Sequence, residues 1–423
     1  MPTAARRPGG TVPPLTVTGR APPRYHRPVR PTSPLALLFV VGLAFFTDSI
    51  LYYLLVPLLP HYAKTFGLSQ MEVGVLFGAY AAAVLGGTWP LGRLADRIGR
   101  KKPFLWGLVG VGVTTLLFAF ATSYAALLVA RVLQGLAAAA TWTAGLALLA
   151  EGFPAARRGQ AMSTAFAAAN VGVLLGPPVS GWLTESLGPR SPFVLAAALA
   201  LADAAARVLL LTDDDPPAGE RVGFGGLLGN ATVRTLAGAM ALGAALWALL
   251  ESTLPLHLDA SLGMGPSEIG VLFAAAALTH TLTSPLMGRL SDRFGRLRIL
   301  RIGFVLAAIL LPLPAFLSTR WTVAASMAAL GVTASFVLSP VSPGLADAVE
   351  AMGTRSFGSV FSLVNVAYSV GMMGGPLVGS ALVEAVGIRG ALVATGGMFA
   401  LYVVPLAVLP SRPAARAATL PPP

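Results

Sequence analysis

Cysteine is absent from the 423-residue chain, and charged residues make up only 11% of it. The lack of cysteine excludes disulfide bonds, thiolate metal sites and cysteine nucleophiles. The charged fraction is less than half of the roughly 25% expected of a soluble domain. Hydrophobic residues account for 55% of the sequence and the mean hydropathy is +0.76. Because too little polar surface remains to cover a soluble globule of this size, the composition indicates an integral membrane protein.

Sequence motifs of common enzyme classes are missing as well. The chain has no HExxH zinc motif, no GxSxG motif between a strand and a helix, and no phosphate-binding loop. We therefore expect no enzyme activity, no metal site and no cofactor. Without a nucleotide-binding domain, transport would draw its energy from an ion gradient, which we expect to be a proton gradient.

Twelve apolar stretches are long enough to cross a bilayer, which needs about 20 apolar residues per helix. They cover residues 35–59, 71–92, 103–121, 124–150, 160–183, 190–211, 234–256, 267–288, 299–317, 321–346, 357–381 and 387–409. The net charge of +12 would point to nucleic acid in a soluble protein. Here the charges lie between the apolar stretches, so membrane topology explains them and we expect no nucleic acid partner.

The distribution of positive charge indicates how these spans are oriented. With the N-terminus inside, 23 of the 29 Lys and Arg residues fall in the tails and cytoplasmic loops, against four on the other side and two within spans. We therefore expect a monomeric, multi-pass protein of the cell's inner (plasma) membrane with both termini in the cytoplasm. Residues 1–33 hold six arginines and no acid, which favours a disordered cytoplasmic tail over a cleaved targeting peptide.

An internal repeat divides the chain into two halves. The phrase GRLADRIGRKK at 92–102 returns as GRLSDRFGRLR at 288–298, an offset of 196 residues. Pro57 and Pro255 are 198 residues apart, and Gly176 and Gly375 are 199 apart. Because six is an even number of spans, both halves enter from the same side and are parallel repeats. The predicted segments are a tail (1–33), a six-helix half (34–212), a cytoplasmic linker (213–233), a second six-helix half (234–410) and a C-terminal tail (411–423).

Motifs at these positions resemble those of the major facilitator superfamily, over residues 35–410. The phrase at 92–102 resembles the loop signature after helix 2, RVLQG at 131–135 the helix 4 signature, and GVLLGPPVSG at 172–181 the helix 5 signature of proton-coupled antiporters. The fold implied is all-α and integral to the membrane, with 12 transmembrane helices in two parallel six-helix halves. The substrate site of this fold lies between the halves near the membrane midplane.

Within that superfamily, the chain more closely resembles the vesicular amine transporters and bacterial multidrug exporters. The similar segments are DSILYYLLVPLLP (48–60), VARVLQG (129–135), LLGPP (174–178), ESTLPL (251–256) and FGSVFSLVNVAYSVGMMGGP (357–376). The resemblance implies a proton-coupled antiporter that exports organic cations or amine-type drugs by alternating access, with family roles carried over to Asp48, Arg131 and Glu251. The vesicular transporters pair a lysine and an aspartate where this chain has Tyr80 and Asn365, which favours a compact bacterial exporter.

Two carboxylates inside predicted spans are the candidates for proton coupling. Asp48 lies about 20 Å along its span, near the midplane, where a carboxylate needs a cavity, a proton or a partner. Glu251 precedes Pro255 by four residues, and the proline favours local irregularity facing a cavity. Competition between a proton and a cation for one carboxylate is sufficient for exchange. The alternative for Asp48 is a fixed bond to Arg131 or Thr47, and for Glu251 simple hydration near the external mouth.

Arg131 and several aromatic or amide side chains complete the predicted site. Arg131 stays protonated, so it would hold a carboxylate; the alternative is a structural clamp to Gln134 or to backbone carbonyls. Rings near a carboxylate attract an amine through cation–π contacts worth about 0.5–2 kcal/mol each, although intramembrane rings also serve as packing or interface anchors. The remaining substrate-binding candidates are Tyr52, Trp142, Asn170, Trp247, Asn365 and Tyr368.

Three further polar residues lie within the predicted spans. His280 is either a second titrating group or a hydrogen-bonded neutral side chain. Asp203 and Arg207 are four residues apart near the cytoplasmic end of their span, so we expect them to neutralise each other and to have a structural role.

Two sets of residues are predicted to gate the transport cycle. The loop set would form a cytoplasmic latch, in which Gly92 and Gly99 allow a tight turn and Asp96 binds a neighbouring arginine or caps a helix. This set comprises Gly92, Asp96, Arg97 and Arg100, with Gly288, Asp292 and Arg293 in the second half. The helix set would permit close helix packing and comprises Gly172, Gly176, Pro177, Gly375 and Pro376. In the family that the chain resembles, the helices carrying this second set meet helices 8 and 2 of the opposite halves.

A symporter or facilitator for a neutral or anionic solute, such as a sugar, is the second transport hypothesis. The two carboxylates, the antiporter-type motif at 172–181 and the lack of surplus polar residues in the spans argue against it. A membrane receptor or an intramembrane enzyme is a third class. The partners expected for the antiporter are a small cationic molecule, protons and the lipid bilayer.

Overall fold

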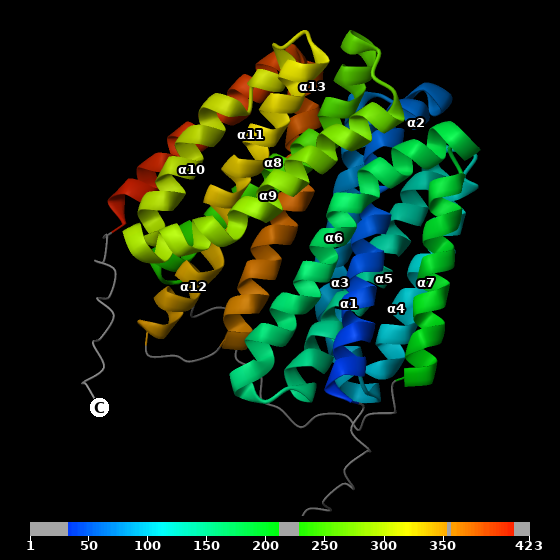
Figure 1. Ribbon diagram of the computed structural model, residues 1–423, viewed down its shortest axis with the longest axis vertical. Helices are drawn as coiled ribbons and strands as arrows, with labels where there is room; N and C mark the ends of the chain where they lie inside the picture. The colour runs from blue at the N-terminus through cyan, green and yellow to red at the C-terminus, as the bar shows by residue number, and fades with distance from the viewer. Residues whose placement is uncertain (1–32, 211–227, 353–356, 410–423) are drawn as a thin grey trace, which may run out of the picture.

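The computed structural model describes residues 33–210, 228–352 and 357–409, which are helical and contain no strand (Figure 1). Short 3₁₀ turns at Val56–Leu58 and Leu313–Ala315 interrupt two of the membrane spans. The helices are α1 Pro34–Tyr53, α2 Leu59–Phe66, α3 Gln70–Ile98, α4 Lys101–Ala119, α5 Tyr124–Gly152, α6 Ala155–Leu187, α7 Ser191–Leu210, α8 Ala231–Leu262, α9 Pro266–Phe294, α10 Arg296–Leu310, α11 Arg320–Leu338, α12 Val341–Glu350 and α13 Phe357–Val408.

Twelve membrane crossings follow from these helices, as the sequence predicts. Eleven helical runs in the described residues are long and apolar enough to span a membrane, and the last of them covers 47 residues, Ser362–Val408. A run of that length is enough for two spans of about 20 residues. Gly387 divides it, because its φ of 72° and ψ of 166° are not helical.

Two six-span halves lie side by side in Figure 1, with α1–α7 on the right and α8–α13 on the left. Across the boundary α6 packs against α9, and α13 against α3, which are the pairings that the family resemblance implies. We call the end of the bundle that carries α2 the α2 end. The connections between separate helices there are three or four residues long and cover residues 67–69, 120–123, 188–190, 263–265 and 316–319.

The doubled phrase is mostly helical, contrary to the prediction that it forms a loop. α3 continues through Gly92 to Ile98, and α9 continues through Gly288 to Phe294. The turns fall at Gly99 (φ 86°) and Gly295 (φ 96°), a conformation that costs glycine little because it has no Cβ. The tight turn predicted at Gly92 is therefore wrong: hydropathy marks where a span leaves the membrane, whereas the helix continues beyond it.

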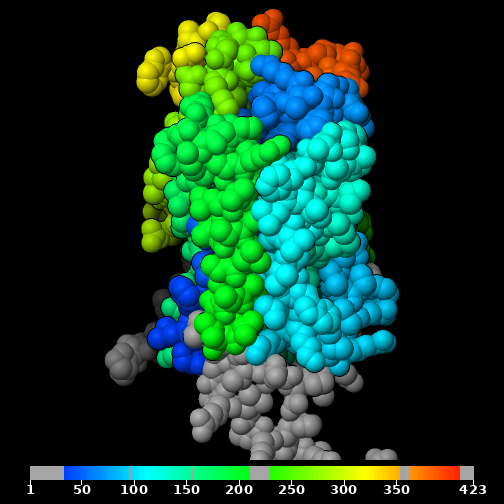
Figure 2. All heavy atoms as spheres, turned by 90° about the vertical axis from the view of Figure 1, so that its right-hand side faces the viewer, coloured from blue at the N-terminus to red at the C-terminus, as the bar shows by residue number. Residues whose placement is uncertain are grey.

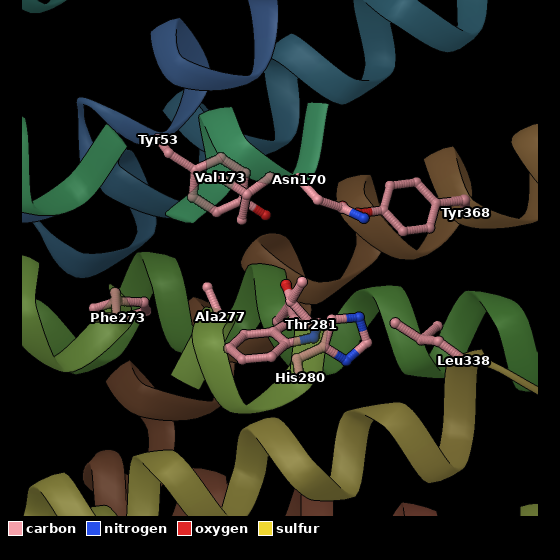
Figure 3. Close-up of a pocket in the computed structure, with 10 residues that line it drawn as sticks. Tyr53, Asn170, Val173, Phe273, Ala277, His280, Thr281, Leu338 and Tyr368 are labelled. Atoms are coloured by element: carbon pink, nitrogen blue, oxygen red, sulfur yellow. The ribbon is translucent and has the colours of Figure 1, made fainter. Parts of the chain in front are cut away.

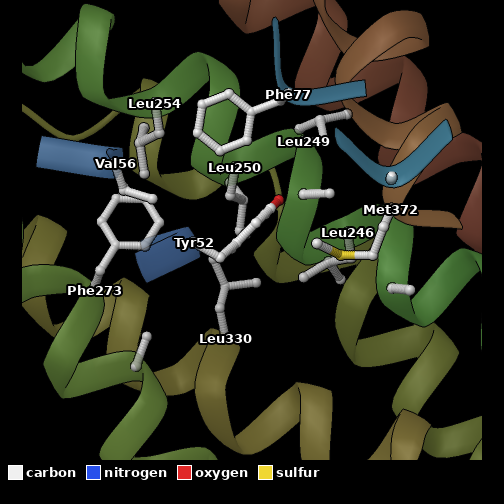
Figure 4. Packing of buried hydrophobic residues seen from close by; sticks show 14 of the residues in the cluster. Tyr52, Val56, Phe77, Leu246, Leu249, Leu250, Leu254, Phe273, Leu330 and Met372 are labelled. Carbon is white, nitrogen blue, oxygen red and sulfur yellow. The ribbon is translucent and has the colours of Figure 1, made fainter. Parts of the chain in front are cut away.

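Apolar side chains pack the halves together around the C-terminal end of α1. Tyr52, Val56 and Phe77 of the first half meet Leu250 and Leu254 of the second in one buried cluster (Figure 4). α1 ends beneath this cluster at Tyr53, just before Pro57, and the Ser180 hydroxyl donates a 2.5 Å hydrogen bond to the carbonyl of Leu54. The break in α1 therefore keeps its backbone satisfied inside the membrane.

The outer surface of the bundle is apolar, as contact with lipid requires. Figure 2 shows one such face, where α4 and α7 lie side by side along their length. Large apolar side chains exposed on these two helices include Trp106, Val113 and Leu117 on α4 and Leu201 and Val208 on α7. In water such a surface would aggregate, so it marks the region that faces the bilayer.

Candidate substrate and proton site

A cavity of about 80 Å³ lies between the two halves (Figure 3). Tyr53 of α1 and Asn170 and Val173 of α6 line it from the first half. The second half contributes Trp247, Phe273, Ala277, His280, Thr281, Leu338 and Tyr368. The lining is aromatic with several hydrogen-bonding groups and has no charged residue. It therefore suits a small molecule with an apolar body and one or two polar groups.

Three of the predicted substrate residues, Asn170, Trp247 and Tyr368, line this cavity, as does His280. Trp247 and His280 meet edge to face, with ring centroids 6.3 Å apart. Nδ1 of His280 is buried without a hydrogen-bond partner among the described residues. The remaining predicted residues are not part of the lining, and Asn365 is half-buried one turn before Tyr368 on α13.

Asp48 is buried in α1, with 4% of its surface exposed. Two donors hold its Oδ2 atom: the indole Nε1–H of Trp142 at 2.6 Å and the hydroxyl of Tyr80 at 3.1 Å. Trp142 in turn stacks on Phe45, with ring centroids 4.0 Å apart. Trp142, a substrate-binding candidate from the sequence, is thus a hydrogen-bond donor to Asp48. Together with Tyr80 it takes the role that the alternative assigned to Arg131 or Thr47.

Glu251 is fully buried in α8, on the other side of the boundary between the halves. The hydroxyl of Tyr52 donates to its Oε2 atom at 3.2 Å, so this hydrogen bond joins the two halves. Its Oε1 atom has no hydrogen-bond partner among the described residues. Tyr53 and Tyr368, which line the cavity, also lie within electrostatic range of Glu251. The carboxylate therefore sits directly behind the cavity wall.

Arg131 lies between the two carboxylates in a cage of aromatic rings. Its Cζ atom is 5.3 Å from the ring centroids of both Tyr52 and Tyr80. Its NH1 donates to Oε1 of Gln134 at 2.8 Å, as one sequence alternative anticipated. No ion pair within 4 Å joins Arg131 to Asp48 or Glu251. Cation–π contacts and one neutral hydrogen bond therefore accommodate this buried charge.

Together these residues form one cluster that reaches across the halves. Asp48 binds Tyr80, the rings of Tyr80 and Tyr52 are 5.0 Å apart, and Tyr52 binds Glu251. With both carboxylates ionised and Arg131 protonated, the cluster carries one net negative charge. A single proton or a single bound cation restores neutrality in this low-dielectric setting.

The sequence did not identify Tyr53, Phe273 and Thr281 as residues of the cavity lining. It singled out Tyr80 only as a position where the vesicular transporters have a charged residue, and not as a partner of Asp48. Helical periodicity could have predicted part of the cavity lining on α9, because Phe273, Ala277 and His280 are spaced so that they lie on one face of a helix. Asp203 and Arg207 form the predicted ion pair, 3.6 Å apart, and both side chains are buried. The Arg207 guanidinium also donates to the Phe104 carbonyl at 3.0 Å.

In the predicted loop set and just beside it, Arg100 and Arg296 form ion pairs within their own halves. Arg100 pairs with Glu151 at 2.6 Å. Arg296 pairs with Asp292 at 3.6 Å and with Asp347 at 2.6 Å. Arg97 is exposed, and Arg293 lies over the ring of Phe294. The side chain of Asp96 lies outside the described residues.

The predicted helix set divides between two kinds of helix contact. Gly172 and Gly176 face α1, and Gly375 faces Ala245 of α8, so these three support packing within a half. Pro177 meets Gly270 of α9 and Pro376 meets Gly74 of α3, so the two prolines lie on the boundary between halves. Gly74 and Gly270, which are 196 residues apart, are the boundary glycines that the sequence did not single out.

Two pseudo-symmetric helical halves with a polar cavity and a charged cluster between them define a secondary transporter of the membrane. The sequence matches the profile of the Major Facilitator Superfamily over residues 39–235 and 236–422, and the chain belongs to this family. Since the family and its relatives are transporters, the chain is a multi-pass membrane transport protein and not an enzyme. Among the described residues, no group of three or more His, Asp or Glu side chains could hold a metal ion.

Several relatives are transporters of synaptic or secretory vesicles. The chromaffin granule amine transporter of Homo sapiens is 30% identical over 346 residues, covering 81% of this chain and 66% of that protein. The synaptic vesicular amine transporter of Mus musculus is 29% identical over 321 residues (75% and 62%), and a probable vesicular acetylcholine transporter of Danio rerio is 30% identical over 376 residues (83% and 74%). The chain thus spans slightly less than two thirds of the length of the amine transporters.

Solved structures agree on the fold. A bacterial homolog of the human lysosomal transporter Spinster, described as inward-facing and unoccupied, superposes with a TM-score of 0.75 at 16% identity, covering 89% of this chain and 97% of that one. A human organic anion transporter superposes with a TM-score of 0.62 at 19% identity, covering 88% and 99%.

Proposed function

We propose that this protein is a proton-coupled antiporter that exports organic cations or amines by alternating access. The observation that carries the proposal is the cluster of Asp48, Glu251 and Arg131, which spans the boundary between the halves beside an aromatic cavity. Relatives named as amine transporters support the substrate class.

A cationic substrate would bind by exchanging with protons on the two carboxylates. The cavity offers the rings of Trp247, Tyr53 and Tyr368 to an ammonium group. The unpartnered Oε1 of Glu251 lies behind this wall and is a buried carboxylate atom that can accept the charge. One bound cation or one proton is enough to make the cluster of Asp48, Glu251 and Arg131 neutral. Binding of the cation therefore favours release of the proton. Asn170 supplies a hydrogen-bonding group from the opposite half.

The α2 end is the external side in this proposal. The excess of positive charge in the loops supports a cytoplasmic position for the opposite end and for both termini. The membrane in this proposal is the plasma membrane. The hydrogen bonds and ion pairs that join the halves between described residues lie at the α2 end and around Glu251. An arrangement closed at that end presents the site to the cytoplasm. The functional unit is a monomer, since one chain contains both halves of the site.

The loop set and the helix set control access to the cavity in this proposal. The phrases at 92–102 and 288–298 would close the cytoplasmic end when the cavity faces outward, and the boundary prolines Pro177 and Pro376 would let the halves rock. Substituting Asp96 with Asn should then slow transport while substrate binding stays near that of the unchanged protein. Loss of binding in a folded variant would contradict this role.

Proton release on substrate binding tests the antiport. Purified protein in weakly buffered detergent solution is titrated with a panel of organic cations, and the released protons are measured with a pH dye. Asp48→Asn and Glu251→Gln should each reduce the release, whereas Glu350→Gln, which changes an exposed acid at the end of α12, serves as the matched control. If no cation releases protons from the unchanged protein, exchange is refuted. If both site variants release them normally, these carboxylates are not the coupling groups.

A further inference from the structure

Two glutamates outside the central cluster occupy equivalent positions in the two halves. Glu185 lies near the end of α6, and Glu384 lies 199 residues later in α13. Each reaches across the boundary to the first turn of a helix in the other half. Glu185 accepts from the backbone N–H of Ser267 at 3.0 Å, and Glu384 accepts from the backbone N–H of Met71 at 2.7 Å.

The acceptor sites are the N-termini of α9 and α3. A helix leaves its first four N–H groups without internal partners, and its N-terminus carries a partial positive charge. One of these N–H groups at each helix is bonded within its own half. The N–H of Ser69 donates to Glu72, and the N–H of Gly265 donates to Glu268. The N–H group of the second residue of each helix donates to a carboxylate of the other half, and this bond completes the cap.

Other contacts hold the same two places together. The hydroxyl of Ser267 also donates to Glu185 at 2.5 Å, and a Cβ on Gly181 would meet the Cα of Ser267 at 2.6 Å. On the other side Gln70 donates to the carbonyl of Ser252 at 3.0 Å and to the hydroxyl of Ser380 at 3.1 Å. These short contacts require the two halves to touch at the α2 end.

Water reaches both glutamates, because their side chains are exposed. When the halves separate, water can take over the freed N–H groups and carboxylates at low cost. A bond of this kind is strong enough to bias a conformational equilibrium and weak enough to break in every cycle. The exposed ion pair of Lys64 and Asp259 at the same end, 2.6 Å apart, is of the same reversible type.

We propose that Glu185 and Glu384 are twin cross-half caps that hold the α2 end closed and set the balance between the two orientations of the transporter. Both caps must break before this end opens. The inference concerns the rigid-body equilibrium and applies whatever solute the cavity carries. Removing one cap should raise the population open at the α2 end about tenfold, as expected for one charge-assisted capping bond, and removing both should raise it about a hundredfold.

Distance measurements between the halves test the caps directly. Because the chain has no cysteine, Thr122→Cys and Ser318→Cys introduce the only two labelling sites. They lie in equivalent exposed connections of the two halves. Double electron–electron resonance of spin labels in lipid nanodiscs then gives the populations with short and long distances. Glu185→Ala and Glu384→Ala should each increase the long-distance population, and the double variant should increase it further.

Matched controls come from the same helix ends. Glu72→Ala and Glu268→Ala remove a carboxylate that caps α3 or α9 from within its own half, and they should leave the distance distribution as in the unchanged protein. An unchanged distribution in Glu185→Ala and Glu384→Ala, or an equal shift in the controls, would overturn the proposal. Should the alanine variants not fold, Glu185→Gln combined with Glu384→Gln keeps the side-chain volume and removes both charges. That pair should still shift the ratio several-fold, and no shift would count against the caps.

Discussion

Replacing Gly270 with alanine should drive apart the two halves at the α2 end. Gly270 is buried in α9 where α6 crosses it, and a Cβ there would lie 2.8 Å from the carbonyl carbon of Pro177 and 3.0 Å from the Cα of Pro178. Both neighbours are backbone atoms, so no side chain can rotate away. The overlap can be relieved only if α6 and α9 separate.

The size of the shift between the two conformations follows from two free-energy terms, of which only one differs between them. Alanine in a helix interior is favoured over glycine by about 1 kcal/mol, whichever way the transporter faces. Overpacking of a tight contact costs about 1–3 kcal/mol, and only in the conformation in which the helices touch. The equilibrium should therefore shift toward separated helices by about 5-fold to 150-fold, since 1.4 kcal/mol corresponds to a factor of ten. The overall thermal stability should change far less, because opening relieves the overlap.

Hydrogen–deuterium exchange measured by mass spectrometry reports this shift. Peptides covering residues 177–187 and 265–272 should exchange faster in Gly270→Ala than in the unchanged protein. Gly86→Ala is the matched control, because it lies inside α3, another helix of the boundary, and no atom lies within 4 Å of the added Cβ. Equal exchange in the two variants would show that the boundary tolerates the methyl group, and the reasoning from close contact would be wrong.

Three further changes test other parts of the structure. Gly99→Ala should lower stability by about 1–2 kcal/mol, since its φ of 86° is unfavourable for a residue with a Cβ; an unchanged thermal midpoint would contradict this. Asp203→Leu should cost about 3–5 kcal/mol by leaving Arg207 buried without its partner, and Arg207→Met added to it should recover most of that loss. Trp142→Phe should cost about 1.5–3 kcal/mol for one hydrogen bond to a buried carboxylate. In an Asp48→Asn background the same change should cost about half as much, as measured by a double-mutant cycle.

The architecture could be predicted from the sequence because it depends on length and periodicity. A membrane span needs a fixed number of apolar residues, and a duplicated chain repeats its landmarks, such as Pro57 and Pro255. The ends of helices follow different physics. Beyond the bilayer a helix continues as long as its backbone bonds and side chains allow. Of the two glycines predicted to allow a tight turn, Gly92 and Gly99, only Gly99 lies at the turn.

The candidate site could be predicted only in part. A carboxylate in an apolar span is conspicuous, so Asp48 and Glu251 are found from the sequence. Rings such as Trp142 can be named as substrate-binding candidates, but the carboxylate that each ring contacts cannot be. Which hydroxyl reaches which carboxylate depends on helix rotation and crossing. That is why the bonds from Tyr80 and Tyr52 emerge only from the structure. Glu185 and Glu384 lie near span ends, where acids are unremarkable, and only their three-dimensional partners set them apart.

The brevity of the connections at the α2 end has a consequence for how quickly the protein can work. Segments of three or four residues, such as 67–69 and 263–265, are too short to fold over an opening as a flap. No chain entropy has to be lost to order such a flap when that side shuts. Opening and shutting must instead come from whole helices sliding as stiff rods, so turnover should depend on membrane fluidity and bilayer thickness rather than on loop composition.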